Sequence, residues 1–222
     1  TFEGTPNDGL IKTTVSPNTS YLVGNPYPSA IDSKKFLEDN SESIYGTIYF
    51  WEHHPGLTEE NDEGHNSSNY VGGYATRNLT MGIAAPNNGD GNIVFRVPGK
   101  YIPIAQGFFI TGSNTGGEVV FKNSQREYRY EGDDSIFFRD GENSEVSETY
   151  QDPVLKIGLD FTNSNNQQLH RQVGVSFNKD RSFSFDLGYD SPLYEPLEND
   201  IQYRAEETKM FWKFDQDDTK YV

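Results

Sequence analysis

Short runs of β-branched and aromatic residues recur along the chain and are separated by segments rich in Gly, Pro and Asn. The runs lie at residues 46–51, 92–97, 106–111, 117–122 and 154–161. Runs of this composition, bounded by turn-forming residues, are typical of β-strands. The pattern therefore predicts a protein built mainly from strands.

Apolar and polar residues alternate most regularly at residues 154–161. The apolar positions fall on every second residue and so share one strand face: Leu155, Ile157, Leu159 and Phe161. Residues 171–177 and 183–189 alternate in the same way, and residues 178–181 between them are predicted to form a hairpin connection. The side chains expected to point inward there are Val173, Val175, Phe177, Phe183, Phe185 and Leu187. Such half-buried alternation is typical of an antiparallel sheet with one solvated face.

Helix signals are confined to short segments. Residues 29–40 begin with two candidate N-cap residues, Ser29 and Asp32, and end at a candidate stop, Asn40. A partial apolar stripe within this segment consists of Ile31, Phe36 and Leu37. Residues 196–203 are a candidate for another single turn. The prediction is an all-β fold, an antiparallel β-sandwich with a jelly-roll-like layout and one or two short helices.

The chain length suits a single β-sandwich module that spans residues 1–222. The acidic and polar segment at 139–153 marks a candidate sub-division, either a connection between two sub-domains or a long surface loop. The chain opens on Thr1 and ends on a strand-like run, so we expect it to be a piece of a longer protein. The sequence allows either one core or two.

Acidic residues outnumber basic ones by 34 to 18, which gives a formal net charge of −16. Nucleic-acid binding depends on Lys and Arg that displace counterions from phosphates, so nucleic acid is not an expected partner. Anionic membranes are disfavoured for the same reason, and no apolar run is long enough to cross a bilayer, so no membrane insertion is expected. The absence of cysteine excludes disulfides, iron–sulfur clusters and thiol catalysis.

Two prolines flank one tyrosine in the motif Asn25-Pro26-Tyr27-Pro28, directly after an apolar run. Each proline fixes its own φ and restricts the preceding residue to extended conformations. This rigidity serves either a rim that presents Tyr27 to a ligand or a sharp exit from a core strand with Tyr27 packed inside. We expect the structural role, because a rigid turn needs no ligand.

Oxygen-rich loops at residues 60–64, 87–92 and 131–134 contain ligands of the kind that Ca²⁺ prefers. The candidate calcium ligands are Asp62, Asp90, Asp133 and Asp134. None of these loops reproduces an EF-hand loop, and solvated carboxylates are the alternative interpretation. Calcium is thus a candidate cofactor, and no cofactor is required by the sequence.

Three of the four histidines lie close to one another in the sequence, at His53, His54 and His65. A transition-metal site would combine His53 and His65 with Glu52 or Asp62. This spacing matches no standard zinc signature, so we do not expect such a site.

Four aromatic residues suggest a sugar-binding platform: Tyr49, Trp51, Tyr70 and Tyr74. Aromatic rings stack on the apolar faces of sugars, and neighbouring polar groups bind the hydroxyls. Tyr49 and Trp51 share one face of the predicted strand, while Ile48 and Phe50 share the other. We expect Tyr49 and Trp51 to pack the core, because buried aromatics are more common than exposed platforms. In the opposite case this pair is available to a ligand.

No catalytic frame is recognisable in the sequence. No Gly-rich phosphate loop precedes a helix, and no G-x-S-x-G motif occurs. Glycoside hydrolysis would need two carboxylates that converge across a cleft. The charged residues near the C-terminal strands are expected to form a structural charge network: Arg171, Asp186, Asp190 and Glu195.

The order of several blocks resembles a family of modules. The blocks are YLVGNPYPSAID, GTIYFWEHH, NYVGGYATRN, YIPIAQGFFI, VVFKNSQREY, FFR, HRQVGVSF, FDLGYD and MFWKFDQDDTKYV. Together they resemble an uncharacterised β-rich module of secreted, adhesin-like cell-surface proteins from Bacteroidota, notably flavobacteria. The resemblance implies export by the type IX secretion system, with a sorting domain after the module. It assigns no biochemical function to the module itself.

The expected function is that of a non-catalytic extracellular module at the outer cell surface, active in adhesion or presentation. Its expected partners are glycans or other surface proteins. One alternative is a carbohydrate-binding module that uses the aromatic platform and a structural calcium ion. A further alternative, a polysaccharide-active enzyme such as a glycosidase or lyase, has no motif in its favour.

Overall fold

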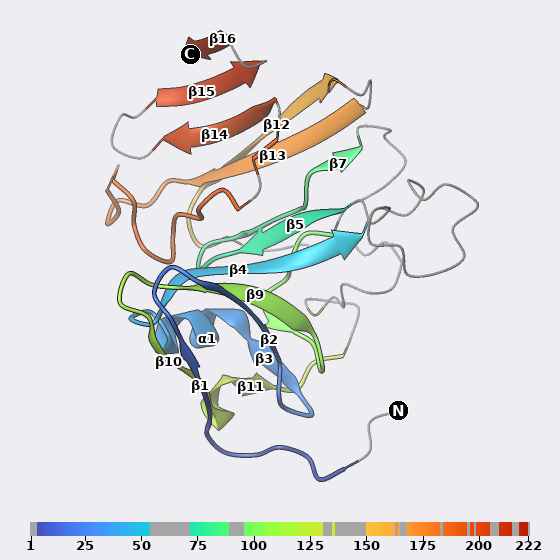
Figure 1. The fold of residues 1–222 in the computed structure, drawn as a ribbon, viewed down its shortest axis with the longest axis vertical. Helices are drawn as coiled ribbons and strands as arrows, with labels where there is room; N and C mark the ends of the chain where they lie inside the picture. Colours follow the sequence, from blue (N-terminus) through green and yellow to red (C-terminus); the bar gives the residue numbers. More distant parts are fainter. Residues whose placement is uncertain are drawn as a thin grey trace, which may run out of the picture.

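The computed structural model describes residues 4–53, 72–88, 96–130, 135, 150–162, 164, 168–182, 184–194, 196–197, 199–204, 209–214 and 218–221. These residues form antiparallel sheets that pack face to face, which confirms the prediction of an all-β sandwich (Figure 1). Within the described residues, the helical elements are α1 (Ser33–Asp39) and the short 3₁₀ turn η2 (Asn123–Gln125).

The strands follow one another along the chain as β1 (Ile11–Val15), β2 (Ser20–Gly24), β3 (Ala30–Asp32), β4 (Ile44–His53), β5 (Gly72–Arg77), β6 (Gly82–Ile83), β7 (Asn87–Asn88), β8 (Tyr101–Ile102), β9 (Gly107–Gly112), β10 (Gly117–Phe121), β11 (Arg126–Glu127), β12 (Val154–Thr162), β13 (Gln168–Ser176), β14 (Asp200–Arg204), β15 (Lys209–Phe214) and β16 (Asp218–Tyr221). Four of the predicted runs therefore lie in β4, β9, β10 and β12. Of the run at 92–97, residues 92–95 lie outside the described part of the chain and residues 96–97 are not in a strand.

The central sheet has five strands in the order β2-β9-β4-β5-β6. Beside it, β1 pairs with β10, and β3 lies between β11 and β8. Further along the chain, β13 lies between β12 and β7, and β15 lies between β14 and β16. In Figure 1 the strands β14 to β16 lie at the top, beyond β12 and β13, while α1 lies in the lower half, above β11.

The main core fills the space between the central sheet and the layer that contains α1. Its buried side chains from the central sheet are Ile48, Phe50, Ala75, Phe108 and Ile110, and those from the opposite layer include Ile31, Phe36, Leu37, Ile102, Val119 and Phe121. The ring of Phe36 packs edge-on against Phe108, with ring centroids 5.5 Å apart. Each such side chain contributes roughly 1.5–3 kcal/mol through burial, so this packing is the main source of stability.

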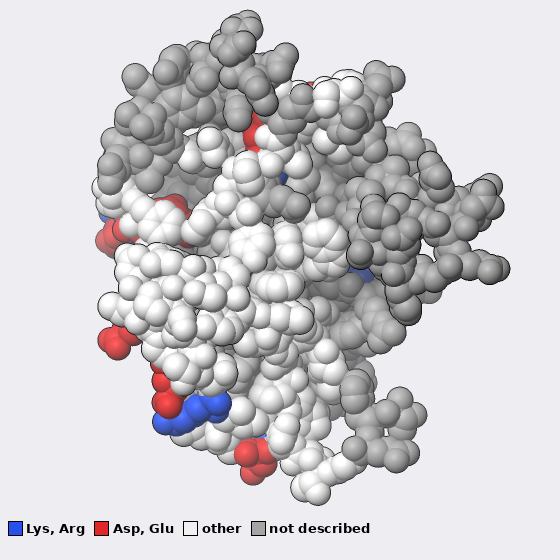
Figure 2. Space-filling view, in the orientation of Figure 1, with Lys and Arg blue, Asp and Glu red and all other residues white. Residues whose placement is uncertain are grey.

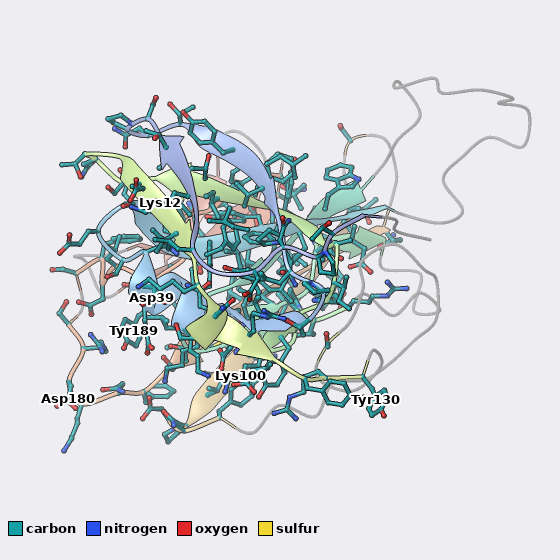
Figure 3. All side chains as sticks on the ribbon, turned by 90° about the horizontal axis from the view of Figure 1, so that it is seen from below. Lys12, Asp39, Lys100, Tyr130, Asp180 and Tyr189 are labelled. Carbon is teal, nitrogen blue, oxygen red and sulfur yellow. The ribbon has the colours of Figure 1, made fainter. Side chains whose placement is uncertain are left out.

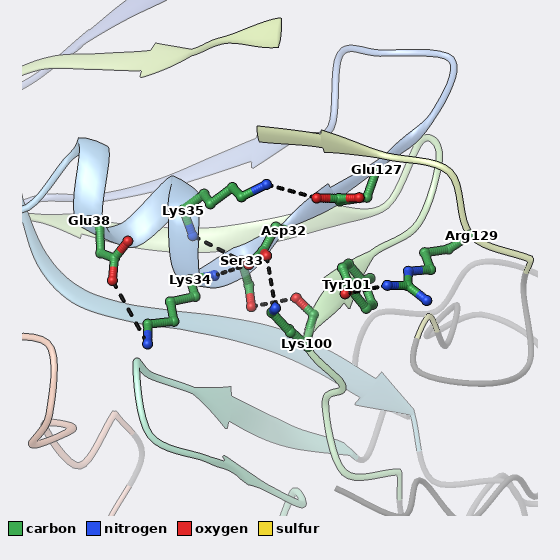
Figure 4. Close-up of polar contacts among 9 residues, drawn as sticks. All are labelled: Asp32, Ser33, Lys34, Lys35, Glu38, Lys100, Tyr101, Glu127 and Arg129. Carbon is green, nitrogen blue, oxygen red and sulfur yellow. Dashed lines mark hydrogen bonds and ion pairs between the residues drawn. The ribbon is translucent and has the colours of Figure 1, made fainter. Parts of the chain in front are cut away.

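Helix α1 begins where the sequence predicted a cap. Of the two candidates, Asp32 is the N-cap residue, and its Oδ1 accepts hydrogen bonds from the backbone N–H groups of Lys34 (2.9 Å) and Lys35 (3.3 Å). The other carboxylate oxygen of Asp32 lies 3.0 Å from the Lys100 ammonium group (Figure 4). The helix ends at Asn40, as predicted, and the Asn40 amide donates to the Phe36 carbonyl. This helix is therefore specified locally and then fixed to β8 by an ion pair.

The motif at residues 25–28 connects β2 to β3 in the interior. Tyr27 is buried, and its hydroxyl donates a 2.6 Å hydrogen bond to the carbonyl of Gly9. The buried Asn25 amide donates to the carbonyl groups of Ser29, Ile102 and Pro103. Tyr27 thus points into the protein, and the motif joins the N-terminal segment to two neighbouring loops.

A second, smaller cluster of buried residues lies between β12, β13 and β14. Leu159, Phe161 and Ile201 form its centre. An ion pair between Arg171 and Asp200 borders it, with Nε and Oδ1 2.9 Å apart and both side chains nearly buried. Because these charges lie out of water, each depends on the other for compensation. The predicted inward positions of Leu159 and Phe161 are confirmed, whereas Leu155 is exposed.

The predicted hairpin at 178–181 is wrong. β13 instead pairs with β12 and β7, and the segment after it is not a strand in the described residues. Phe177, Phe185 and Leu187 are exposed rather than inward, and Phe183 lies outside the described residues. The turn predicted at 196–203 is also wrong, because residues 200–204 form β14. The alternation of apolar and polar residues identified the apolar positions, but it did not show whether another strand packs against them.

The segment at 186–194 crosses the central sheet instead of pairing with β13. Gly46, at a bulge of β4 with φ 74°, lies so close to this segment that a Cβ atom there would be 2.4 Å from the Gly188 Cα. The Asn78 amide donates to the Tyr189 carbonyl at 2.6 Å, and the Leu79 N–H donates to the Gly188 carbonyl at 2.9 Å. We call residues 186–194 the strap. Its contacts join a C-terminal segment to the edge of the main core.

Residues 139–149 of the candidate sub-division lie outside the described residues. Across that gap, β13 packs against β6, since a Cβ atom at Gly174 would lie 2.9 Å from the Ile83 Cδ1 atom. The sheets that contain β6 and β13 are thus in contact. The single module over residues 1–222 stays a prediction.

Candidate functional site

The candidate site lies on the outer face of the central sheet, on the side opposite the main core. In β4 the inward residues are Ile48 and Phe50, and Tyr49 and Trp51 point to the outer face. The expectation that Tyr49 and Trp51 pack the core is confirmed for Tyr49, which is buried against residues 186–194 and not in the main core, and is wrong for Trp51, which is 36% exposed. Helix α1 lies on the other side of the sheet, so the main core on that side is filled by Ile48 and Phe50, which alternate with Tyr49 and Trp51.

Aromatic rings from three strands and the strap meet on this outer face. The rings of Trp51 and Tyr74 lie edge to face with centroids 5.0 Å apart, and those of Tyr74 and Phe109 are 5.5 Å apart. Tyr194 of the strap lies 4.7 Å from the Tyr74 ring and 4.5 Å from the Tyr49 ring. We call this group the aromatic face: Tyr49, Trp51, Tyr74, Phe109 and Tyr194.

The strap covers one part of the aromatic face and leaves another part open. Tyr49 is buried, and its hydroxyl donates a 3.2 Å hydrogen bond to the Pro192 carbonyl. This burial raises the pKa of the Tyr49 hydroxyl well above its usual range. Trp51, in contrast, is 36% exposed, and Leu22 on β2 is 66% exposed. The accessible surface therefore runs from Trp51 towards Leu22, beside the strap.

On this face, none of the strand side chains that the structure describes is charged. Pleating and strand register place on it Ser20, Leu22, Tyr49, Trp51, Tyr74, Thr76, Ile83, Phe109 and Thr111. In Figure 2 the central part of the molecule, over β4 and β9, carries neither red nor blue, and the charged side chains lie mainly along its left and lower edges. On a chain with a net charge of −16, such a surface is unusual.

The structure brings together Tyr49, Trp51 and Tyr74 of the predicted sugar platform, while Tyr70 lies outside the described residues. Sequence reasoning did not identify Phe109, Tyr194 or Leu22 as neighbours of these residues. Alternation within residues 106–111 could have placed Phe109 opposite Phe108 and Ile110. Tyr194 lies on the strap, beyond the alternation at residues 183–189, in a stretch for which the sequence contains no strand or helix signal.

The four calcium candidates, Asp62, Asp90, Asp133 and Asp134, all lie outside the described residues. The same holds for His54 and His65. In the residues that the structure describes, no group of three His, Cys, Asp or Glu side chains is arranged to hold a metal ion. Calcium binding stays a prediction.

Glu52 follows Trp51 on β4 but points to the side of the core. Its carboxylate oxygens accept hydrogen bonds from the backbone N–H of Arg96 at 3.3 and 3.2 Å. Burial raises the pKa of Glu52 to about 7, although the Arg96 backbone N–H and guanidinium lower it in part. This carboxyl group therefore changes its charge near neutral pH, just beneath the aromatic face.

The described contacts around Arg171 differ from the predicted charge network. Arg171 pairs with Asp200, whereas the Asp186 carboxylate accepts from the Ser182 N–H and the Asp190 carboxylate accepts from the Asp186 N–H. Glu195 lies outside the described residues. The two aspartates instead shape the beginning of the strap.

A separate exposed aromatic pair follows β11. Tyr128 and Tyr130 have ring centroids 5.4 Å apart, and Tyr130 lies at the periphery of the molecule (Figure 3). Between them in the sequence, Arg129 stacks on the Tyr101 ring and donates to its hydroxyl at 2.6 Å. This pair does not adjoin the aromatic face, and its backbone is held by the Arg129 contact.

Fold and site define an antiparallel β-sandwich with a sheet face on which aromatic side chains from several strands meet. More specifically, the chain belongs to the family described as a domain of unknown function (DUF8693), whose family model matches residues 1–213. No curated protein and no solved structure matches the chain. In the described ranges, no helix has both the length and the apolar character needed to cross a bilayer.

Proposed function

We propose that this chain is a non-catalytic contact module of a secreted or cell-surface protein, and that it acts in adhesion or presentation through the aromatic face. The observation that carries the proposal is the exposed surface around Trp51 and Leu22, on which the described strands place no charged side chain although the chain is strongly acidic. A surface without charges is dehydrated on contact at low cost, and aromatic side chains are enriched at the centres of binding surfaces.

Three described carboxylates have structural partners, which supports a non-catalytic role. Asp32 caps α1, Asp39 pairs with Lys122 at 2.7 Å, and Asp200 pairs with Arg171. These groups are engaged in holding elements together. Glu52 has a raised pKa but lies on the core side of the sheet, away from the exposed rings.

Neutral glycans are the ligand class that this surface favours. Trp51 and Tyr74 offer aromatic rings to the apolar faces of sugars, and hydroxyl groups at Thr76, Thr111 and Ser20 lie on the same sheet face. The described side chains of this face offer no cation to an acidic sugar, and the net negative charge of the chain repels one. This is the carbohydrate-binding form of the proposed contact function.

A glycan array with the purified chain tests the proposal. We expect binding to neutral glycans that is lost in Trp51→Ala, while Leu155→Ala, at an exposed leucine on β12, retains it. Circular dichroism confirms that both variants are folded. If the chain bound surface proteins but no glycan, the contact function would still hold and the assignment of glycans as the ligand would be rejected. Turnover of polysaccharides or peptides by the purified chain would contradict the non-catalytic role.

A further inference from the structure

The strand β2 is an open edge of the central sheet. It pairs with β9 on one side, and no other described strand pairs with it. The edge strand on the opposite side, β6, is packed against β13, where Met81 and Ile83 lie against Gly174. Among the described strands, the central sheet therefore has one edge that packs against another strand and one edge that does not.

The backbone of β2 presents hydrogen-bonding groups to solvent at every second residue. The Gly112 N–H donates to the Thr19 carbonyl at 3.0 Å, and the Asn25 N–H donates to the Gln106 carbonyl at 3.0 Å. In an antiparallel pair these bonds recur at every second residue, so the N–H and C=O groups of residues 21 and 23 point towards β9. Those of residues 20, 22 and 24 point away, and no described residue bonds to them.

This edge lacks the features that usually prevent strand addition. Natural edge strands carry lysine, proline, bulges or inward charges, because unpaired backbone groups are a template for another strand. The strand β2 reads Ser-Tyr-Leu-Val-Gly, without charge or proline, and pairs with β9 without a register shift. Leu22 at its centre is 66% exposed.

We propose that β2 is a self-association site, at which a second copy of this chain adds its own β2 in antiparallel orientation about a two-fold axis at Leu22. Leu22 then faces Leu22 of the partner subunit, and Ser20 faces Gly24 of the partner subunit. All outward N–H and C=O groups at residues 20, 22 and 24 find partners. The two central sheets become one continuous sheet.

The symmetry of the strand favours a second copy over an unrelated chain. The outward groups lie symmetrically about Leu22, so one strand is complementary to itself when reversed. The end residues Ser20 and Gly24 are small, and no like charges meet across the axis. The two outer faces, aromatic and charge-free, then lie side by side on one surface. The net charge of −16 on each copy opposes association at long range, so added salt strengthens the dimer.

Engineered cysteines test the register directly, since the chain contains no cysteine of its own. Residues opposed in a hydrogen-bonded antiparallel pair have Cα atoms about 5.5 Å apart, a distance that a disulfide spans. Leu22→Cys is expected to form a covalent dimer under mild oxidation. Ser20→Cys is expected not to do so, because residue 20 faces residue 24. Leu155→Cys on β12 is the matched control for an exposed leucine elsewhere.

Sedimentation velocity with the unmodified chain gives the second test. We expect a monomer–dimer equilibrium that moves towards dimer with salt, with the dissociation constant raised about tenfold or more in Leu22→Pro. Proline at residue 22 removes an outward N–H and leaves the bonds to β9 intact. Amide exchange at residues 22 and 24 should slow as concentration rises. A chain that stays monomeric at all concentrations, or a dimer lost in Leu155→Lys but kept in Leu22→Pro, would overturn the proposal.

Discussion

Replacing Glu52 by glutamine should stabilise the protein above neutral pH and have a much smaller effect in acid. Glu52→Gln keeps an oxygen that accepts from the Arg96 N–H and removes the charge that burial disfavours. The pKa of Glu52 is raised from 4.5 to about 7 in the folded protein. Since one pKa unit corresponds to about 1.4 kcal/mol, the ionised carboxylate costs about 3 kcal/mol of folding free energy. Partial solvent access makes this an upper value.

The direction of this pH dependence follows from the linkage between proton binding and folding. A carboxyl group with a higher pKa in the folded state binds a proton more tightly there, so folding is penalised at pH values above about 7. The penalty is relieved as the pH falls from about 7 towards 4.5. The stability advantage of Glu52→Gln should therefore be largest at pH 8 and shrink over this window.

Urea unfolding at a series of pH values between 8 and 5 measures this difference. At each pH, the free energy of unfolding of the unmodified chain is subtracted from that of the variant. This subtraction cancels the contribution from the titration of all other groups. Glu118→Gln, at an exposed glutamate paired with Lys12, is the control for loss of one negative charge. An advantage of Glu52→Gln that is the same at pH 8 and pH 5 would refute the reasoning.

Two further substitutions test the strap and the helix cap. Gly46→Ala should lower the free energy of unfolding by about 3 kcal/mol or more, because the new Cβ atom meets the Gly188 backbone. Gly9→Ala is the control, since Gly9 also has a positive φ but a Cβ atom there has no neighbour within 4 Å. This control should lower the free energy of unfolding by only about 1 kcal/mol. Equal losses in denaturant unfolding would show that the contact with the strap is unimportant. Asp32→Ala should cost about 2 kcal/mol, from the lost cap and the ion pair with Lys100. Asp32→Asn keeps the cap and should cost less than half as much in thermal unfolding; equal costs would rule out capping as the main role.

Local features of the sequence determined the all-β class and several elements. Alternation at 154–161 depends on the two-residue period of a strand, which holds wherever one face is buried. The helix after Asp32 follows from a capping carboxylate and three apolar residues, and these act over one or two turns. Tyr27 is inward because two prolines leave its backbone few conformations and a buried hydroxyl finds the Gly9 carbonyl.

The tertiary structure decided which face of each strand is covered and by what. Side chains alternate between the two faces of a strand, so Tyr49 shares one face with Trp51 and Ile48 shares the other with Phe50. Only the position of α1 determines which of these two faces is turned towards the main core. The strap contacts β4 from residues more than a hundred positions away, through Gly188 and Pro192. No local pattern encodes such a contact, because it depends on shape and on backbone hydrogen bonds that any residue can make. The sequence by itself thus determined the strands and the caps, and long-range packing decided that the aromatic rings gather on the outer face of the central sheet, partly beneath the strap.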